Sequence, residues 1–264
     1  MQRIALIGAG NMGNAMLSGW VSSGIPSEMI IIADKDSSKL EKLKKYNIKV
    51  AENNYEAVNG SDVIVLAVKP DDSLGVLEEI RDFLLQDCVL VSIVAALTTK
   101  KIREIIGSGP SVVRVMPNLA ATVRASISAY SIDMGTREFP DEVLNLLHVM
   151  GDAIEVNESL MDIVTAISGS GPAYFFYMVE ALQEAGRTLG MSPDIARTLA
   201  RGTLWSAAAV LKETGKEAED LRKAVSSPGG TTVAAIGEFE KAGLKGIVTS
   251  AVLAAKKRAA ELSM

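Results

Sequence analysis

Short apolar runs alternate with helical patterns along roughly the first 157 residues. Continuous apolar runs are typical of strands buried on both faces of a parallel sheet. Helical patterns lie at 14–22, where Gly24 and Pro26 end the helix, and at 37–46, which is amphipathic and rich in lysine. The apolar runs lie at 4–7, 29–33, 63–68, 89–93, 111–115 and 125–130. The alternation predicts βαβ units in a doubly wound, mostly parallel sheet of the Rossmann type.

The pattern changes after residue 158. From Leu160 onward the chain is rich in Ala, Leu and Met at helical spacing, as at 173–189 and 194–212. We therefore expect a dinucleotide-binding Rossmann domain at 1–158 and an all-helical domain at 159–264. A short, strongly apolar helical domain often buries its excess apolar surface against a partner subunit.

Composition excludes several classes of function. The net charge is −5, and a mildly acidic protein repels a nucleic-acid backbone. The chain has one cysteine, Cys88 in an apolar run, and one histidine, His148. This argues against a disulfide, a Cys/His zinc site and a Ser-His triad, so no metal is expected. The first residues lack a signal-peptide pattern and no apolar stretch is long enough to span a membrane, which predicts a cytoplasmic protein without a membrane partner.

A glycine-rich turn directly follows the first predicted strand, with the sequence Gly8-Ala9-Gly10-Asn11-Met12-Gly13. Gly8 permits a tight turn, Gly10 lets a pyrophosphate approach the backbone, and Gly13 allows close packing of helix on strand. The next helix offers N-terminal N–H groups and a positive dipole end to the phosphates. With an acid about twenty residues further on, the segment predicts a dinucleotide site, and its residues are candidate cofactor contacts.

Asp34 ends the second predicted strand, where an acid usually binds the ribose hydroxyls of NAD. A carboxylate at this place would repel the 2′-phosphate of NADP. Four side chains that are able to hold this phosphate follow at once: Lys35, Ser37, Ser38 and Lys39. The alternative for the two lysines is a solvated helix face. The sequence therefore leaves the choice between NADH and NADPH open.

Two further segments follow predicted strands, where loops of a parallel sheet line the cofactor crevice. The first is Ala67-Val68-Lys69-Pro70. In it, Lys69 is either a cofactor contact or a surface charge. The second segment ends at Asn118, whose amide is either a partner for the nicotinamide carboxamide or part of an ordinary turn after proline.

Two segments of the helical half are rich in small residues. The segment 168–174, with Ser168 and Ser170, opens a long predicted helix, and its free N–H groups would face a bound molecule. A plain interdomain hinge is the alternative. The second segment predicts a nest of backbone donors for a small anion such as a carboxylate, or helix capping by its threonines: Gly229-Gly230-Thr231-Thr232. The lysine that a phosphate-binding P-loop needs after the glycines is missing.

Together these segments resemble the pyrroline-5-carboxylate reductases along nearly the whole chain. The most specific parts are 168–174 and 225–236, and Asn54 fits a family position that contacts the adenosine ribose or its phosphate. The resemblance implies a Rossmann domain followed by a helical substrate-binding and dimerisation domain. It also implies an oxidoreductase of proline biosynthesis that uses NADPH or NADH to reduce a cyclic imine to L-proline. Homodimers that often assemble into decamers are implied as well.

The resemblance also assigns residue roles in the helical half. The backbone of Gly229, Gly230, Thr231 and Thr232 would hold the substrate carboxylate, with Ser168 and Ser170 as further substrate contacts. The Thr232 hydroxyl would lie near the ring nitrogen and act as the catalytic group. The chain departs from the family at 119–120, where Leu-Ala replaces Thr-Pro, and at 217–218, where Glu-Ala replaces His-Pro. The first departure lies near the expected nicotinamide and affects substrate fit or turnover, whereas the second alters only a loop.

The expected chemistry needs no strong general acid, because an iminium is already electron-poor and rate comes mainly from placing the nicotinamide against it. One rival interpretation, a β-hydroxyacid dehydrogenase, requires a lysine four residues after a glycine. Here Ala173 follows Gly169 and Phe175 follows Gly171 at that spacing. A second rival, a nicotinamide-sensing regulatory subunit, would not need the segment 229–232. A related cyclic imine as substrate is a further alternative.

Overall fold

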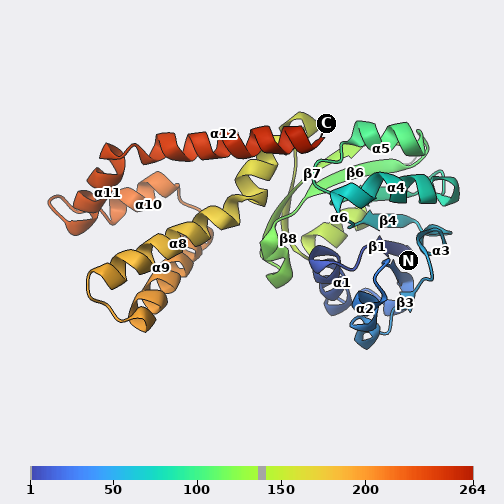
Figure 1. Cartoon of the computed structure of the whole chain (residues 1–264), viewed down its shortest axis with the longest axis horizontal. Coiled ribbons are helices and arrows are strands. Elements are labelled where there is room, and N and C mark those ends of the chain that lie inside the picture. The colour runs from blue at the N-terminus through green and yellow to red at the C-terminus, as the bar shows by residue number, and fades with distance from the viewer. Residues whose placement is uncertain (1, 136–140, 264) are drawn as a thin grey trace. The chain divides into compact units, whose positions relative to one another are not determined.

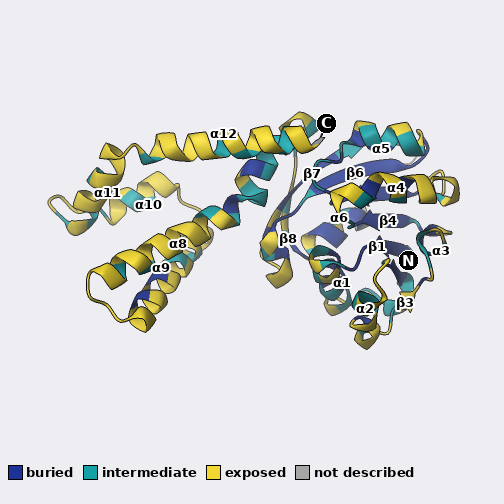
Figure 2. Ribbon diagram, viewed as in Figure 1, coloured by how far each residue is buried: buried dark blue, intermediate teal, exposed yellow. Residues whose placement is uncertain are grey.

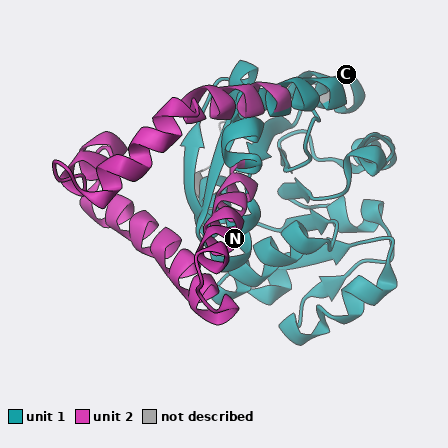
Figure 3. Ribbon diagram, turned by 60° about the vertical axis from the view of Figure 1, so that its left-hand side comes forward, with its two compact units in different colours: residues 1–170, 255–264 teal, residues 171–254 magenta. Residues whose placement is uncertain are grey.

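The chain, in a computed structural model that describes residues 2–135 and 141–263, folds into two compact units (Figure 3). One unit comprises residues 1–170 and 255–264, and the other comprises residues 171–254. Residues 159–170 therefore belong to the same compact unit as the sheet, whereas the sequence pattern predicted a domain boundary between residues 158 and 159. The first unit carries every strand of the described residues, and the second is helical (Figure 1).

An eight-stranded sheet forms the centre of the first unit, in the order β3-β2-β1-β4-β5-β6-β7-β8. All neighbouring strands run parallel except β6 and β7. This confirms the doubly wound, mostly parallel sheet. The strand order reverses between β1 and β4, and ligands of such sheets bind at this switch point. The strands are β1 (Ile4–Ile7), β2 (Ile30–Ala33), β3 (Lys49–Val50), β4 (Val63–Leu66), β5 (Val89–Ser92), β6 (Ser111–Met116), β7 (Ser126–Asp133) and β8 (Gly151–Glu155).

The two edge strands, β3 and β8, were not predicted from the sequence. Both residues of β3 are exposed, and β8 has exposed residues among half-buried ones. Neither strand therefore contains the continuous apolar run that identifies β1, β2, β4 and β5, which are buried at every position. Edge strands need less apolar surface because only one neighbour pairs with them.

Helices cover both faces of the sheet, so successive strand residues point into two separate cores. Leu6 and Val65 pack with Trp20 on one face, and Ile7 and Leu66 pack with Leu77 on the other. Figure 2 shows the buried strands between less buried helices. The helices of this part of the chain are α1 (Asn11–Ser22), α2 (Ser37–Glu41), α3 (Asn54–Val58), α4 (Pro70–Ile80), α5 (Thr99–Ile106), α6 (Asp141–His148) and α7 (Met161–Val164).

One predicted helix is shorter in the structure than the sequence pattern indicated. The helix predicted at 37–46 is wrong, because α2 ends at Glu41 and a separate 3₁₀ turn spans Lys44–Tyr46. Cys88 is fully buried, as expected for an apolar run, and His148 is exposed at the end of α6.

The second unit is built from helices that leave many large apolar side chains exposed. Helix α8 packs along α9, yet Trp205 is 76% exposed and Tyr177 is 74% exposed. Consistent with the sequence pattern, the described residues after Leu160 contain no strand. Across the described chain, none of the helices is both long and apolar enough to span a membrane. The helices are α8 (Gly171–Thr188), α9 (Pro193–Thr214), α10 (Ala218–Ala224), α11 (Thr231–Lys241) and α12 (Leu244–Ser263), whose last turns group with the first unit.

Candidate cofactor and substrate sites

The glycine-rich turn lies where the carboxyl ends of β1, β2 and β4 come together. The Gly8 N–H donates to the Ala33 carbonyl over 2.8 Å, and the Ala67 N–H donates to the Ile7 carbonyl over 2.7 Å. Gly8 has a φ of +108°, and a Cβ there would collide with the Ala67 carbonyl oxygen. Only glycine fits this position, because both its backbone conformation and the nearby strand end exclude a side chain.

The other two glycines of the turn differ in what surrounds them. Gly10 precedes α1, and a Cβ built on it would meet nothing within 4 Å. A Cβ on Gly13 would collide with the Gly8 carbonyl oxygen. The first intrahelical bond comes from the Asn14 N–H to the Gly10 carbonyl. The N–H groups of residues 11–13 are therefore available in front of an open backbone, an arrangement that fits a pyrophosphate.

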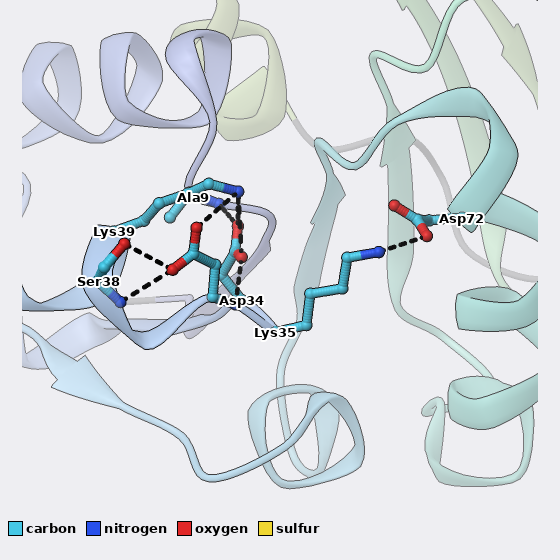
Figure 4. Close-up of polar contacts among 7 residues, drawn as sticks. Ala9, Asp34, Lys35, Ser38, Lys39 and Asp72 are labelled. Atoms are coloured by element: carbon cyan, nitrogen blue, oxygen red, sulfur yellow. Dashed lines mark hydrogen bonds and ion pairs between the residues drawn. The ribbon is translucent and has the colours of Figure 1, made fainter.

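The Asp34 carboxylate is bonded to the turn rather than exposed to solvent (Figure 4). It accepts hydrogen bonds from the Ala9 N–H over 2.7 Å and from the Asp36 N–H over 2.8 Å. The Lys39 ammonium lies 3.3 Å from the same carboxylate, whose side chain is only 7% exposed. Asp34 thus fixes the glycine turn against the loop after β2, which is a role that the sequence pattern did not indicate.

Lys35 forms an ion pair with Asp72 in the first turn of α4 (Figure 4). The Lys35 Nζ lies 2.6 Å from Asp72 Oδ1, and the two side chains are 77% and 34% exposed. Their hydrogen bond raises the pKa of Lys35 and lowers the pKa of Asp72, so both groups are charged near neutral pH. The pair joins the loop after β2 to the helix after β4.

A second polar contact joins α3 to α4 nearby in the chain. The Asn54 side-chain amide donates to Glu79 Oε2 over 2.8 Å. Sequence reasoning singled out Asn54 and Lys35 but missed both carboxylate partners, Asp72 and Glu79. One feature of the sequence could have identified these acids: both lie on the helix that begins at Pro70, the last residue of a predicted cofactor segment.

The segment after β4 turns directly into α4. Ala67 and Val68 are half-buried, whereas Lys69 and Pro70 are exposed. Lys69 is the residue before the helix and Pro70 its first residue, a position that suits proline because no N–H is needed there. Within the described part of the chain, Lys69 forms no ion pair, so its charge is available to a ligand.

Asn118 has the turn role, which is one of the two roles that the sequence left open. Its Oδ1 accepts a hydrogen bond from the Ala120 N–H over 3.0 Å. The residue thereby caps the 3₁₀ turn Leu119–Val123. Its own N–H donates to Ser126 Oγ over 3.2 Å, and the residue is buried. No described residue accepts a hydrogen bond from the side-chain amide nitrogen of Asn118. The turn fixes the oxygen end of the amide, and no described residue binds the nitrogen end.

The segment 168–174 contains the start of α8, as the sequence predicted, but helical turns rather than a loop lead into it. Helix α7 continues through a π-helical stretch, Thr165–Gly169, before α8 starts at Gly171. The Ser168 hydroxyl donates to the Val164 carbonyl over 3.1 Å, and the Ser170 N–H donates to the Thr165 carbonyl over 2.8 Å. Helical turns thus precede α8, and the Ser170 N–H is not free. Wide π-helical turns are common at functional sites.

In the second unit, the glycine pair forms the turn before α11. Gly229 has a φ of +70°, and Gly230 is the residue before the helix. The Gly230 N–H donates to the Ser227 carbonyl over 2.9 Å, so this donor is not available for an anion. Thr231 and Thr232 are the first residues of α11 and do not cap it. The first intrahelical bond is donated by the Ala234 N–H, which leaves the N–H groups of residues 231–233 available.

Comparison with known proteins covers the whole chain. A family model described as "Pyrroline-5-carboxylate reductase dimerisation" matches residues 158–262, and one described as "NADP oxidoreductase coenzyme F420-dependent" matches residues 3–96. A pyrroline-5-carboxylate reductase of Corynebacterium melassecola is 39% identical over 99% of both chains. One of Methanosarcina acetivorans is 38% identical over 99% of this chain and 98% of its own.

Solved structures give the same result. A pyrroline-5-carboxylate reductase from Coxiella burnetii has a TM-score of 0.94 at 34% identity, over 100% of this chain and 99% of its own. The Plasmodium falciparum pyrroline carboxylate reductase, solved with NADP bound, has a TM-score of 0.86 at 28% identity, over 100% of this chain and 98% of its own. The chain therefore belongs to the pyrroline-5-carboxylate reductase family.

Proposed function

We propose that this protein is a pyrroline-5-carboxylate reductase, which uses NADPH or NADH to reduce 1-pyrroline-5-carboxylate to L-proline. The observation that carries this proposal is the 39% identity over 99% of the chain with a relative of that name. The open backbone at Gly10 and the available N–H groups at the start of α1 support it independently, because they suit a dinucleotide.

The first unit supplies the cofactor contacts of this proposal. The turn from Gly8 to Gly13, with Asn11 and Met12 at the start of α1, binds the pyrophosphate. The adenosine end is contacted by Lys35, Asn54 and the loop that Asp34 holds in place. The segment 67–70 and the free amide donor of Asn118 are placed after β4 and β6, where they contact the nicotinamide half. When bound, the reduced nicotinamide supplies the hydride.

The substrate contacts of this proposal lie at the start of α11 and in the π-helical stretch. The available N–H groups of Thr231 and Thr232 and the backbone of Gly229 hold the substrate carboxylate, helped by the positive end of the helix dipole. Gly230 contributes by shaping the turn, since its own N–H is already bonded. The Thr232 hydroxyl bonds to the ring nitrogen. Ser168 and Ser170 are proposed separately, as substrate contacts of the first unit.

These residues account for the reaction without a side chain that transfers a proton. The imine arrives protonated from water, so hydride addition to its carbon leaves a neutral amine. The chain's task is to hold the carboxylate and the ring nitrogen so that the imine carbon faces the nicotinamide. A β-hydroxyacid dehydrogenase would need a lysine four residues after a glycine. At that spacing from Gly169 and Gly171 this chain has Ala173 and Phe175, which disfavours that alternative.

The helical half forms a homodimer. A dimerisation model matches 158–262, and large apolar side chains such as Phe175 and Trp205 are 60% and 76% exposed in the single chain. Exposed apolar surface of this extent is typical of subunit interfaces. We propose that 159–264 acts as the functional dimerisation and substrate region. Assembly of dimers into a decamer, and a cytoplasmic location, remain predictions.

The proposal is tested by steady-state kinetics with the purified protein. We expect the absorbance of NADPH or NADH to fall when 1-pyrroline-5-carboxylate is added, with L-proline as product. Pyrroline-2-carboxylate serves as the control substrate. Oxidation with the control alone would assign the protein to a related imine, and oxidation with neither substrate would contradict the proposed reaction.

A further inference from the structure

The acid expected to select NADH is not free to do so. Asp34 lies at the end of β2, where a carboxylate ordinarily binds the 2′- and 3′-hydroxyls of NAD. Here both of its oxygens accept backbone hydrogen bonds, from Ala9 and Asp36, and Lys39 neutralises its charge. Its side chain is 7% exposed. Because its charge is already compensated, Asp34 repels a neighbouring phosphate far less than a free carboxylate would.

The cation best placed to meet a 2′-phosphate is Lys35. It directly follows the residue at which the ribose binds in this fold, and its side chain is 77% exposed. Lys39, the other lysine near Asp34, lies within 4.0 Å of both Asp34 and Asp36 and is only 39% exposed. Figure 4 shows Lys35 extended away from the glycine turn toward Asp72. Among the described residues, its ammonium forms an ion pair with Asp72 alone, and Asp72 belongs to another element.

We propose that Asp72 is a specificity-determining residue: it holds Lys35 in the absence of cofactor, and the 2′-phosphate of NADPH takes its place as the partner of Lys35. The inference rests on the proposed function only in that a nicotinamide dinucleotide binds at the glycine turn. Lys35 favours NADPH, and Asp72 opposes it by competing for the same ammonium and by repelling the phosphate. The balance between these two charges sets the preference for NADPH over NADH.

The physical properties of the pair suit such an exchange. It is an exposed ion pair, and such pairs contribute little to stability, so it is easily broken. A phosphate carries more negative charge than a carboxylate and therefore binds the ammonium more strongly. The pKa of Lys35 is raised and that of Asp72 is lowered by their contact, so both groups are charged near neutral pH.

The test uses two fragments that differ only at the 2′ position, adenosine 2′,5′-bisphosphate and adenosine 5′-monophosphate. Their dissociation constants are measured by calorimetry with the full-length protein at low salt, and the ratio of the two reports recognition of the 2′-phosphate. We expect Asp72→Asn to shift this ratio about two- to fivefold toward the bisphosphate. We expect Lys35→Gln to shift it about tenfold the other way.

The matched control is Asp71→Asn, one residue earlier on α4. Asp71 is exposed and forms no ion pair within the described residues, so the same change of net charge should leave the ratio within about twofold of the wild-type value. Equal ratios in the Asp71 and Asp72 variants would overturn the proposal. A ratio that moves toward the monophosphate in Asp72→Asn would also overturn it, because Asp72 would then orient Lys35 rather than compete for it.

This test separates the inference from the proposed reaction. Both fragments lack the nicotinamide, and no imine is present, so the result does not depend on turnover. If the fragments behave as expected and 1-pyrroline-5-carboxylate is not reduced, the inference holds and the proposed substrate fails. If the imine is reduced and the ratio is unaffected by both Asp72→Asn and Lys35→Gln, the reaction holds and the inference fails.

Discussion

Arg114 Nη1 lies 3.1 Å from Glu158 Oε1, and the Arg114 side chain is only 6% exposed. Asp162 Oδ1 lies 3.9 Å from the other end of the same guanidinium. Glu158 also accepts hydrogen bonds from the backbone N–H and the hydroxyl of Thr99, at the start of α5. This cluster therefore ties the segment that leads into α7 to β6 and α5 within the first unit.

Glu158→Gln should lower the free energy of unfolding by about 1–3 kcal/mol, because the buried Arg114 loses its nearest charged partner. Urea and thermal unfolding of the purified protein measure this loss. Glu155→Gln is the matched control, since Glu155 is exposed and forms no ion pair with any residue that the structure describes. Equal stability of the two variants would show that the cluster does not contribute.

Gly10→Ala should preserve stability but impair cofactor binding. The added methyl group meets nothing within 4 Å, so the midpoint of thermal unfolding should stay close to the wild-type value. The same methyl occupies the space through which a pyrophosphate approaches the backbone. We expect NADPH to bind about tenfold or more weakly, measured by the fluorescence of the bound nucleotide. Unchanged affinity would place the pyrophosphate elsewhere.

Gly13→Ala should fail in a different way, by destabilising the fold. Its methyl group collides with the Gly8 carbonyl oxygen, which is backbone and cannot rotate away. We expect a loss of about 1–3 kcal/mol in unfolding free energy, together with weaker NADPH binding. Comparing the two alanine variants in one thermal-unfolding series separates a packing glycine from a ligand-facing one. Equal midpoints would contradict this distinction.

Sequence patterns predicted those parts of the fold that depend on consecutive residues. β1, β2, β4 and β5 are continuous apolar runs because both faces of each strand are buried. β8 pairs only with β7 and leaves polar residues exposed, so it lacks such a run. Residues 37–46 have an amphipathic helical pattern, but the α-helix ends at Glu41. The pattern does not reveal this end, because periodicity does not distinguish an α-helix from successive helical turns.

The candidate site shows the same division. The glycine turn was found because its strand, turn and helix are consecutive. The Lys35–Asp72 and Asn54–Glu79 contacts join residues 37 and 25 positions apart, and a single sequence does not show which acid meets which cation. The hydrogen bond of the Gly230 N–H to Ser227 was also invisible, because it depends on the turn that Gly229 adopts with positive φ.

Cys88 should be almost unreactive in the folded protein. Burial raises the pKa of its thiol from 9.0 to about 12, so very little thiolate exists at pH 8, and reagents have little access. Because it is the only cysteine, a thiol-titration assay reports it alone, with Cys88→Ser as the blank. We expect slow reaction in buffer and complete reaction in guanidinium chloride. Rapid reaction of the native protein would contradict the burial.

The same thiol gives a stability prediction at high pH. The unfolded chain ionises Cys88 near pH 9, but the folded protein keeps it protonated up to about pH 12. A pKa that is raised on folding contributes stability below the unfolded value, and that contribution is lost as the pH rises through this window. Between pH 9 and 11 the wild type should therefore lose more unfolding free energy than Cys88→Ala. Parallel pH profiles would show that the thiol is not protected.

Thr232→Ala should reduce kcat/KM for 1-pyrroline-5-carboxylate about ten- to thirtyfold, because a hydrogen bond to the reacting nitrogen is lost. The affinity for NADPH should not change, since the first unit carries the proposed cofactor contacts. Thr249→Ala is the matched control: within the described residues, the hydroxyl that it removes donates to the Lys245 carbonyl on α12 and to no other group. A kcat/KM in Thr232→Ala equal to that of the control would exclude Thr232 from the reaction. In that case the substrate role of the segment would rest on its backbone N–H groups, which the alanine variant retains.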